Sequence, residues 1–390
     1  MPRLALDTIT RRAGRSSVAR RSRNFTFTRS TLPPPLASAS TPSISRRCAG
    51  ATAIAAVATS AGALAFLQPT NRASSSVTRD VMVSATAPAA SSTSPSAAAG
   101  SPANLDLLVV GPGVLGSVLA KNWIETVPGS TATGLTNSDR SHGRLRAMGL
   151  TPATRQSLPA NRKWSFVAFS APPSGSDDYV ADVKAALQLW DGTGSFLFTS
   201  SMSVCSVDSG GEVTDEKCPL VPLGAGPSTD RLLGAEAATL EAGGNVLRLV
   251  GLYHTNRGAH TYFIKVGTVA RPGGYVVNLL HYEDAAAMGA AILRGDGSGP
   301  FRSRVFLGAD GHPVTFEDMV EACFSSGVFP RTAVTFTGSF PEGGSSGRGK
   351  RVANDASRLA LGGWRPRYAS FAEFMAAGGK DFYNTSGLAF

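Results

Sequence analysis

Cysteine and histidine are scarce in this sequence, which has four Cys and five His in 390 residues. Cys205, Cys218 and Cys323 match no paired-cysteine metal motif, and no two histidines stand four residues apart. We therefore expect no metal site. Three thiols after residue 103 are typical of a reducing compartment, whereas a Cys205–Cys218 disulfide would indicate an oxidising one.

Acidic side chains are nearly absent from the first 103 residues, which contain twelve Arg, no Lys and only Asp7 and Asp80 as acids. Residues 104–390 hold 25 basic and 25 acidic side chains, so the net charge of +10 belongs to the N-terminal part. The rest of the chain has no clustered basic segment, and we therefore expect no nucleic-acid partner.

Strongly hydrophobic runs are missing as well. The uncharged stretch 48–66 consists mainly of Ala, Gly and Thr, and it is poor in the large apolar residues that a stable membrane span contains. We expect no membrane span in the mature protein.

The N-terminal part has the composition of an organelle transit peptide, because it is rich in Arg and Ser and poor in acids. Its Ser, Ala and Pro content favours a chloroplast, and we predict a targeting peptide over residues 1–72 and a flexible linker over 73–103. Arg46-Arg47 ahead of the uncharged stretch resembles a second signal for the thylakoid lumen. The stroma is favoured over the lumen, where the nicotinamide cofactor inferred below is not expected.

From residue 105 short apolar runs alternate with helical patterns. Predicted strands cover 105–110, 131–138 with its turn, 163–173, 195–201 and 245–250, and predicted helices cover 117–126, 179–190 and 231–242. This alternation predicts an α/β fold, a Rossmann-type doubly wound parallel sheet over residues 104–250. After residue 250 the pattern loosens. Strands near 275–280 and 305–307 and helices near 285–293 and 315–326 predict a small C-terminal α+β substrate lobe, 251–390, interleaved with the Rossmann core.

The segment "LDLLVVGPGVLGSVLAKNW" places a glycine motif between a predicted strand and a predicted helix. In that context Gly111 permits a tight turn, Gly113 lets the backbone approach a pyrophosphate, and Gly116 lets the helix pack on the sheet. The first helical amides, those of Val114 and Leu115, would then face the phosphates. The motif predicts a bound dinucleotide.

The end of the second predicted strand indicates which dinucleotide is bound. A carboxylate there favours NAD, whereas this chain has Thr136, Asn137, Ser138 and Arg140, which could surround a 2′-phosphate. NADP is therefore favoured over NAD, although Arg140 could also be a solvated surface charge. The turn after the next strand, Ala171-Pro172, is a further expected cofactor contact.

Four later segments extend the match beyond the glycines: "FLFTSSMSVCSVDSGGEVTDEKCPLVP", "LRLVGLYHTNRG", "VVNLLHYEDAAAMGAAIL" and "RVANDASRLALGGWRPRYASFAEF". With them, residues 105–375 resemble the extended short-chain dehydrogenase/reductase superfamily, which includes nucleotide-sugar epimerases and dehydratases. The closest resemblance is to its atypical members, which are known only as NAD(P)-binding Rossmann proteins.

The resemblance implies a catalytic Tyr, a Lys four residues later and a Glu eight residues after the Tyr. Aligning that Glu with Glu236 puts Ser228 at the Tyr position and Leu232 at the Lys position, so the usual proton donor is absent.

Several residues could replace that pair. The resemblance places Ser200 beside the nicotinamide, as a cofactor contact and a candidate catalytic hydroxyl, and it puts Tyr253 and His254 where the substrate side of the cleft begins. Arg257 could bind an anionic substrate. His281 is a candidate substrate contact, although in this superfamily His281 and Asp284 most often serve structure.

Two functions remain open. The first is an NADP(H)-dependent oxidoreductase, or an epimerase/dehydratase-like enzyme, that uses a non-standard acid/base on an unidentified small-molecule substrate. The second is a non-catalytic NAD(P)-binding Rossmann protein that acts as a sensor or structural partner in the plastid.

Overall fold

The structure is a computed structural model that describes residues 104–213, 218–344 and 346–384. The predicted targeting peptide (1–72) and linker (73–103) lie outside the described residues, so both stay predictions. Among the residues described, no helix has the length and apolar character needed to cross a membrane.

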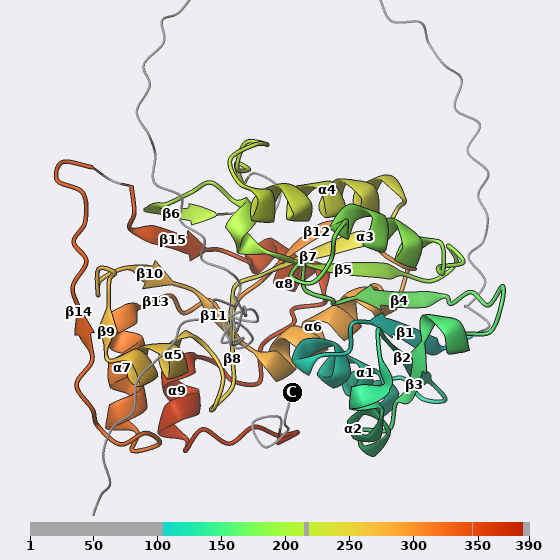
Figure 1. Cartoon of the computed structure of the whole chain (residues 1–390), viewed down its shortest axis with the longest axis horizontal. Helices are drawn as coiled ribbons and strands as arrows, with labels where there is room; N and C mark the ends of the chain where they lie inside the picture. The colour runs from blue at the N-terminus through green and yellow to red at the C-terminus, as the bar shows by residue number, and fades with distance from the viewer. Residues whose placement is uncertain (1–103, 214–217, 345, 385–390) are drawn as a thin grey trace, which may run out of the picture. The chain divides into compact units, whose positions relative to one another are not determined.

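A seven-stranded sheet in which every pair of neighbours is parallel forms the centre of the described chain (Figure 1). From edge to edge its strands are β12 (Val305–Gly308), β7 (Asn245–Leu249), β5 (Phe196–Ser201), β4 (Phe166–Phe169), β1 (Asp106–Val110), β2 (Thr131–Thr136) and β3 (Thr151–Thr154). The chain runs outward from β1 to β3, then crosses back to β4 and runs outward the other way. This order confirms the predicted Rossmann-type doubly wound sheet.

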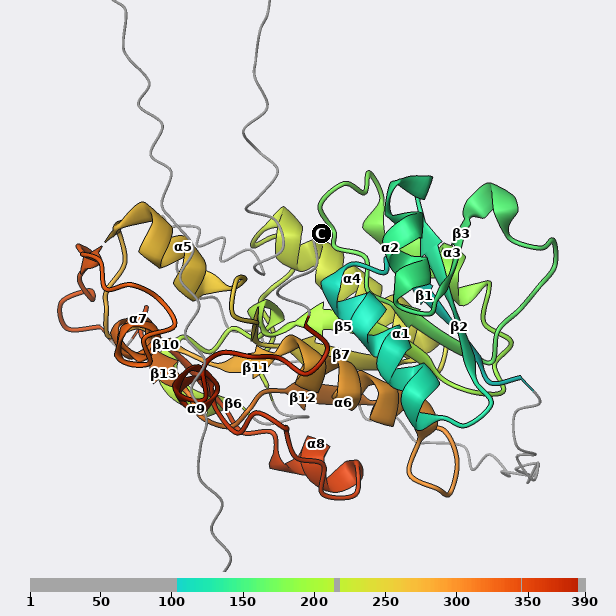
Figure 2. The same ribbon diagram turned by 90° about the horizontal axis from the view of Figure 1, so that it is seen from below.

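Helices cover both faces of the sheet. In Figure 1, α3 (Tyr179–Leu187) and α4 (Pro227–Glu241) lie above it, and α1 (Val114–Thr126) and α6 (Tyr282–Arg294) lie below it. Figure 2 shows α1 and α6 side by side on their common face.

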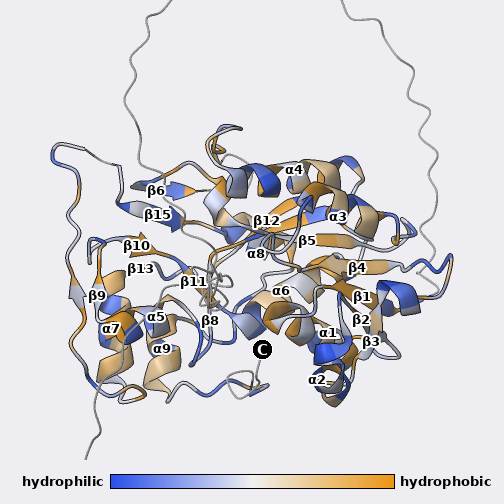
Figure 3. Cartoon of the chain, viewed as in Figure 1, coloured by the Kyte–Doolittle hydropathy of each residue, from blue (hydrophilic) through white to orange (hydrophobic). Residues whose placement is uncertain are grey.

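Strand β1 illustrates why the sheet needs helices on both faces. Its side chains alternate between two buried clusters: Leu107 and Val109 pack with α1 and α6, whereas Leu108 and Val110 pack with α3 and α4. When both faces of a strand are covered by helices, the side chains that point to either face are apolar. Figure 3 shows the resulting hydrophobic colour of the central strands.

Most of the remaining elements form a smaller lobe, whose core is a third, aromatic-rich cluster. A four-stranded sheet has the order β13 (Val314–Thr315), β10 (Val276–Val277), β15 (Gly349–Val352) and β6 (Ser209–Val213). Two further pairs are β8 (Gly251–Tyr253) with β11 (Leu279–His281), and β9 (Thr268–Val269) with β14 (Thr335–Phe336). The helices of this lobe are α5 (Ala259–Val266), α7 (Phe316–Ser325) and α9 (Phe371–Ala376), whereas α8 (Asp355–Ala360) packs against β12 of the large sheet.

The two parts of the chain exchange elements. Strand β12 and helix α6, which follow residue 250, complete the large sheet and its lower face, whereas β6, which precedes residue 250, joins the sheet of the smaller lobe. The lobe is thus built from both sides of the predicted boundary.

Several element boundaries differ from the sequence-based expectation. Helix α4 begins at Pro227 rather than 231, because a proline is well accommodated in the first turn. Helix α6 begins at Tyr282 rather than 285, because His281 caps it by accepting a hydrogen bond from the amide of Glu283. Helix α2 (His142–Ala147) and the neighbouring strand β3 were not predicted.

Candidate functional site

The glycine loop joins β1 to α1 at the point where the strand order reverses. A Cβ on Gly111, where φ is +77°, would lie 2.5 Å from the Cα of Ala171, and a Cβ on Gly116 would lie 2.9 Å from the carbonyl oxygen of Gly111. A Cβ on Gly113 would meet no atom of the described chain within 4 Å. The protein's own packing therefore requires the first and third glycines, whereas the second faces open space.

The N-terminus of α1 has the properties of an anion site. Gly113 is its N-cap, no side chain in the described structure caps it, and its first turn contains no acid. The amides of the first turn, including those of Val114 and Leu115, have no partner within the helix, and the helix dipole makes this end positive. These features, together with the space at Gly113, fit the pyrophosphate of a dinucleotide.

The turn after β4 lies against this loop. Ala171 is half-buried and Pro172 is exposed, while Ser170, which the sequence analysis did not single out, donates its amide to the carbonyl oxygen of Val110. The Ser170 hydroxyl is buried without a hydrogen-bond partner among the residues described. A buried polar atom of this kind usually has a ligand or water partner.

The residues after β2 lie largely in solvent. Thr136 is half-buried and its hydroxyl lies 2.9 Å from Nε2 of His142, whereas Asn137, Ser138 and Arg140 are exposed. All four stand at the carboxyl end of β2, next to the strand that leads into the glycine loop.

Arg144 is a residue of this region that the sequence analysis missed. It lies on α2, and its Nη2 donates to the carbonyl oxygen of Pro112 at 3.4 Å, so its guanidinium stands beside the glycine loop. Partial burial lowers the pKa of Arg144 below its usual value. Three arginines near His142 in the sequence, Arg140, Arg144 and Arg146, could have indicated an anion site. Because no helix was predicted there, the sequence did not show which of them faces the glycine loop.

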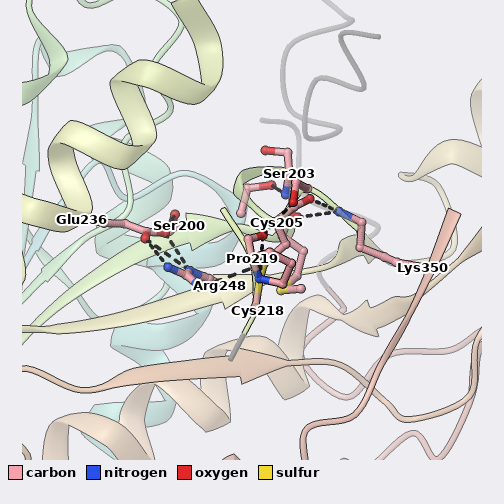
Figure 4. The surroundings of a disulfide bond; sticks show 11 residues. Ser200, Ser203, Cys205, Cys218, Pro219, Glu236, Arg248 and Lys350 are labelled. Carbon is pink, nitrogen blue, oxygen red and sulfur yellow. Dashed lines mark hydrogen bonds and ion pairs between the residues drawn. A yellow bond between two sulfur atoms is a disulfide. The ribbon is translucent and has the colours of Figure 1, made fainter. Parts of the chain in front are cut away.

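Ser200 belongs to a buried cluster that also contains the Glu236–Arg248 ion pair (Figure 4). Its hydroxyl donates to Oε1 of Glu236 at 2.5 Å, and Glu236 forms an ion pair with Arg248 whose shortest distance is 2.7 Å. All three residues are at most 6% exposed. The single proton of the Ser200 hydroxyl is therefore donated to a carboxylate on the α4 face of the sheet.

Helix α4 carries the two positions aligned with the missing Tyr and Lys. Ser228 lies in its first turn and is half-buried, whereas Leu232 is 6% exposed and packs in the apolar cluster between α3, α4 and the sheet. An apolar side chain at Leu232 supplies no charge that could lower the pKa of a neighbouring hydroxyl.

Tyr253 and His254 are both buried in the smaller lobe. Tyr253 is 0% exposed, its ring packs against His281, Phe371 and Phe374, and its hydroxyl has no partner among the described residues. Burial raises the pKa of Tyr253 well above its ordinary value. The aromatic rings of the lobe therefore enclose this phenol, and none of its surface is exposed to solvent.

His254 is 4% exposed, and its Nδ1 accepts a hydrogen bond from the amide of Asn256. Burial lowers the pKa of His254 to about 4, so the imidazole is neutral at pH 7 and has no spare proton to give as an acid. Only the role of a base would remain open to it.

Arg257 is half-buried and donates from Nε to the hydroxyl of Tyr282 at 3.1 Å. His281 is 0% exposed, caps α6, and has a pKa lowered to about 3 by burial. Asp284 accepts the amides of Arg367 and Tyr368, which fastens the C-terminal segment to α6. The geometry of His281 and Asp284 is thus structural, while Arg257 keeps partial access to solvent.

Cys205 and Cys218 are joined by a disulfide, with their Cα atoms 5.9 Å apart (Figure 4). Of the two alternatives that the sequence left open, the structure therefore shows the bonded pair rather than two thiols. Cys323 is a buried free thiol. No group of three or more potential metal ligands comes together within the described ranges.

No family model and no curated protein matches the sequence. Solved structures do match its fold. A conserved protein of unknown function from Silicibacter pomeroyi is 22% identical with a TM-score of 0.56, over 70% of this chain and 98% of that one. The dTDP-glucose 4,6-dehydratase of Bacillus anthracis, in complex with NAD, is 14% identical with a TM-score of 0.55, over 70% and 95%.

The UDP-glucuronic acid 4-epimerase of Bacillus cereus, in complex with NAD, is 15% identical with a TM-score of 0.54, over 70% of this chain and 96% of that one. At these identities the likeness is one of fold. The described chain is therefore similar in its Rossmann-like fold to a dehydratase, an epimerase and a protein of unknown function, over nearly the whole length of each.

Proposed function

We propose that the chain binds a nicotinamide dinucleotide, with its pyrophosphate on the glycine loop at the carboxyl ends of β1 and β4. The open space at Gly113, between two glycines that the packing requires, carries this proposal. Two proteins of the same fold, the Bacillus anthracis dehydratase and the Bacillus cereus epimerase, hold NAD. We also propose that the chain is an atypical member of the extended short-chain dehydrogenase/reductase superfamily.

We propose NADP(H) as the preferred dinucleotide. No acid follows β2 directly, and two guanidinium groups, those of exposed Arg140 and half-buried Arg144, lie at the end of that strand. A 2′-phosphate would gain charge-assisted hydrogen bonds there, whereas the 2′-hydroxyl of NAD(H) would gain much less.

We expect Arg144→Ala to weaken NADPH binding by about 10- to 100-fold and NADH binding by no more than about twofold, since a hydrogen bond to a charged group contributes about 1.5–3 kcal/mol. Arg140→Ala should shift the preference in the same direction. Calorimetric titration of both variants with both cofactors measures the effect, and Arg146→Ala, an exposed Arg on the same helix, is the matched control. Equal losses for NADPH and NADH would contradict this placement of the 2′-phosphate.

We further propose that the bound dinucleotide serves a sensing or structural role. The bound nicotinamide would supply a hydride donor or acceptor, but Ser228 and Leu232 stand on α4 where the resemblance implies the proton-donating Tyr and its Lys. Leu232 is apolar and buried, Tyr253 lies in the lobe core, and Ser200 donates to Glu236. A plastid complex is the setting that we propose for this role.

An oxidoreductase or epimerase/dehydratase-like enzyme is the second candidate, and the partial exposure of Arg257 and Ser201 favours it. Ser201 is the last residue of β5, at the carboxyl edge of the large sheet, and Arg257 lies shortly after β8 of the two-stranded sheet. An anionic substrate could reach the guanidinium of Arg257. Absorbance at 340 nm in the presence of carbonyl compounds tests the oxidoreductase, and chromatography of nucleotide sugars after incubation tests the epimerase or dehydratase, whose turnover leaves no net change in the cofactor. Turnover that Arg257→Ala abolishes would establish the enzyme, and tight NADPH binding without turnover would support the sensing role.

We propose the chloroplast stroma as the location, because the proposed nicotinamide cofactor is expected there. A permanent Cys205–Cys218 disulfide would favour the oxidising lumen instead, so the proposal requires that the bond be reducible. A fluorescent protein fused behind residues 1–103 is expected to accumulate in the plastid stroma of a plant or algal cell, because the segment has the composition of a transit peptide. Replacing Arg3, Arg11, Arg12 and Arg15 by Glu should leave the fusion in the cytosol. Accumulation of the unaltered fusion in mitochondria, in the thylakoid lumen or in the cytosol would contradict the proposal.

A further inference from the structure

The Cys205–Cys218 disulfide lies at a junction of the fold. Cys205 follows the carboxyl end of β5 by one short 3-10 turn, Met202–Val204, and strand β6 lies between the two cysteines. Cys205 is 2% exposed and Cys218 is 9% exposed. The bond therefore closes the segment that leads from the large sheet into the four-stranded sheet of the smaller lobe.

Residues of the segment that follows Cys205 bind strand β15 of the smaller lobe through hydrogen bonds and strand pairing. Asp208 accepts hydrogen bonds from the amides of Gly347 and Gly349 and from the hydroxyl of Tyr275, and β6 pairs with β15 along its length. Lys350, on β15, donates from Nζ to the carbonyl oxygens of Met202 and Cys205. The attachment of β15 to the end of β5 thus depends on residues that the disulfide restrains.

The disulfide also touches the buried ionic cluster (Figure 4). Nη1 of Arg248 lies 4.0 Å from Sγ of Cys205, and the same guanidinium is paired with Glu236, which binds the Ser200 hydroxyl. A thiolate formed at Cys205 would stand beside this positive charge, which favours its departure as a leaving group.

We propose that Cys205–Cys218 is a reversible dithiol–disulfide site, which an external dithiol reductant opens and its oxidised form closes. This inference does not depend on the proposed cofactor. A reductant thiolate attacks Sγ of Cys218, the less deeply buried of the two residues; the disulfide breaks and Cys205 leaves as a thiolate. The second thiolate of the reductant then attacks the mixed disulfide and releases Cys218. Two electrons pass to the protein, both cysteines take up protons, and the reductant becomes a disulfide.

Opening the bond is expected to loosen the pairing of β6 with β15 while the large sheet persists. The closed loop limits the freedom of the segment that carries Asp208, and reduction restores that freedom. Strands β1, β4 and β5 are held by their own neighbours in the sheet and by the helices on its two faces. Both cysteines pack in the apolar cluster under α3 and α4, but the bond between them cross-links none of these elements. The redox state would thus set how firmly the smaller lobe is attached to the end of β5.

Hydrogen exchange of the full chain, followed by mass spectrometry before and after treatment with dithiothreitol, tests the proposal. Amides in Ser209–Val213 and Gly349–Val352 are expected to exchange at least about tenfold faster in the reduced protein, and those of Asp106–Val110 at an unchanged rate. Re-oxidation should restore the slow rate. Cys323→Ala should respond as the parent does, and Cys205→Ser/Cys218→Ser should exchange rapidly at β6 and β15 whether or not dithiothreitol is present.

Three results would overturn the proposal. If the amides of β6 and β15 exchanged at the same rate in both redox states, the bond would have no influence on the pairing of these strands. Loss of protection in Asp106–Val110 on reduction would mean that the whole fold requires the bond. Alkylation that finds Cys205 and Cys218 still joined after dithiothreitol treatment of the folded chain would show that no reductant reaches them.

Discussion

A Gly113→Val protein is expected to fold as the parent does and to bind NADPH at least about 100-fold more weakly, a loss of about 3 kcal/mol in binding free energy. Gly113 has a φ of −71°, which any residue adopts, and no atom of the described chain lies within 4 Å of a Cβ placed there. The valine side chain would instead occupy the space that we assign to the pyrophosphate. Calorimetric titration measures the loss, and thermal unfolding checks that the fold is intact.

The neighbouring glycines show why this position is the informative one. Valine at Gly111 or Gly116 would collide with Ala171 or with the carbonyl oxygen of Gly111, so a loss of binding there would follow from a damaged fold. Gly274→Val in the smaller lobe is the matched control, because a Cβ there makes only ordinary contact with Phe340 at 3.5 Å. Parent-like NADPH affinity in Gly113→Val would remove the glycine loop from the binding site.

Glu236→Ala is expected to lower the free energy of unfolding by about 3–5 kcal/mol, because it leaves the buried guanidinium of Arg248 without its carboxylate. The pair is bidentate and both side chains are at most 7% exposed. The Ser200 hydroxyl loses its acceptor at the same time. Equilibrium unfolding in urea measures the change.

Glu321→Ala is the matched control for this prediction. Glu321 makes an equally short ion pair with Arg331, at 2.6 Å, but the side chains are 53% and 62% exposed. An exposed pair of this kind contributes no more than about 1 kcal/mol, because water screens it and solvates each charge after the other is removed. An equally small loss of unfolding free energy in both variants would mean that the buried Glu236–Arg248 pair stabilises the fold no more than an exposed pair does.

The central sheet was predictable from the sequence because burial on both faces leaves a clear mark. Strands such as β1, β4 and β5 must be apolar on both sides, so they stand out as short apolar runs. The glycine loop was predictable for a related reason, since its motif has meaning only between such a strand and a helix.

The surroundings of the site were less predictable, because they depend on orientation and on contacts between distant segments. Arg144 lies on a six-residue helix whose single buried residue, Leu145, gives no periodic pattern. Tyr253 reads as a cleft residue by its place in the sequence, yet Phe371 and Phe374, more than a hundred residues later, enclose it.

The orientation of Ser200 could have been predicted from the alternation of side chains along β5, which a comparison of motifs does not consider. In β5, residues Phe196 and Phe198 point into the cluster beneath α3 and α4, and the period of two puts Ser200 on that same face. Glu236 lies buried on α4 opposite this face. Strand alternation thus places Ser200 toward Glu236, and Ser201 on the other side.

The most direct test of the account is calorimetric titration of the purified chain with NADPH and with NADH, repeated on Gly113→Val. We predict micromolar binding of NADPH, weaker binding of NADH, and loss of both in the variant while its thermal unfolding stays parent-like. Failure of the folded parent to bind either cofactor would contradict the account, because the open glycine loop would then hold no dinucleotide.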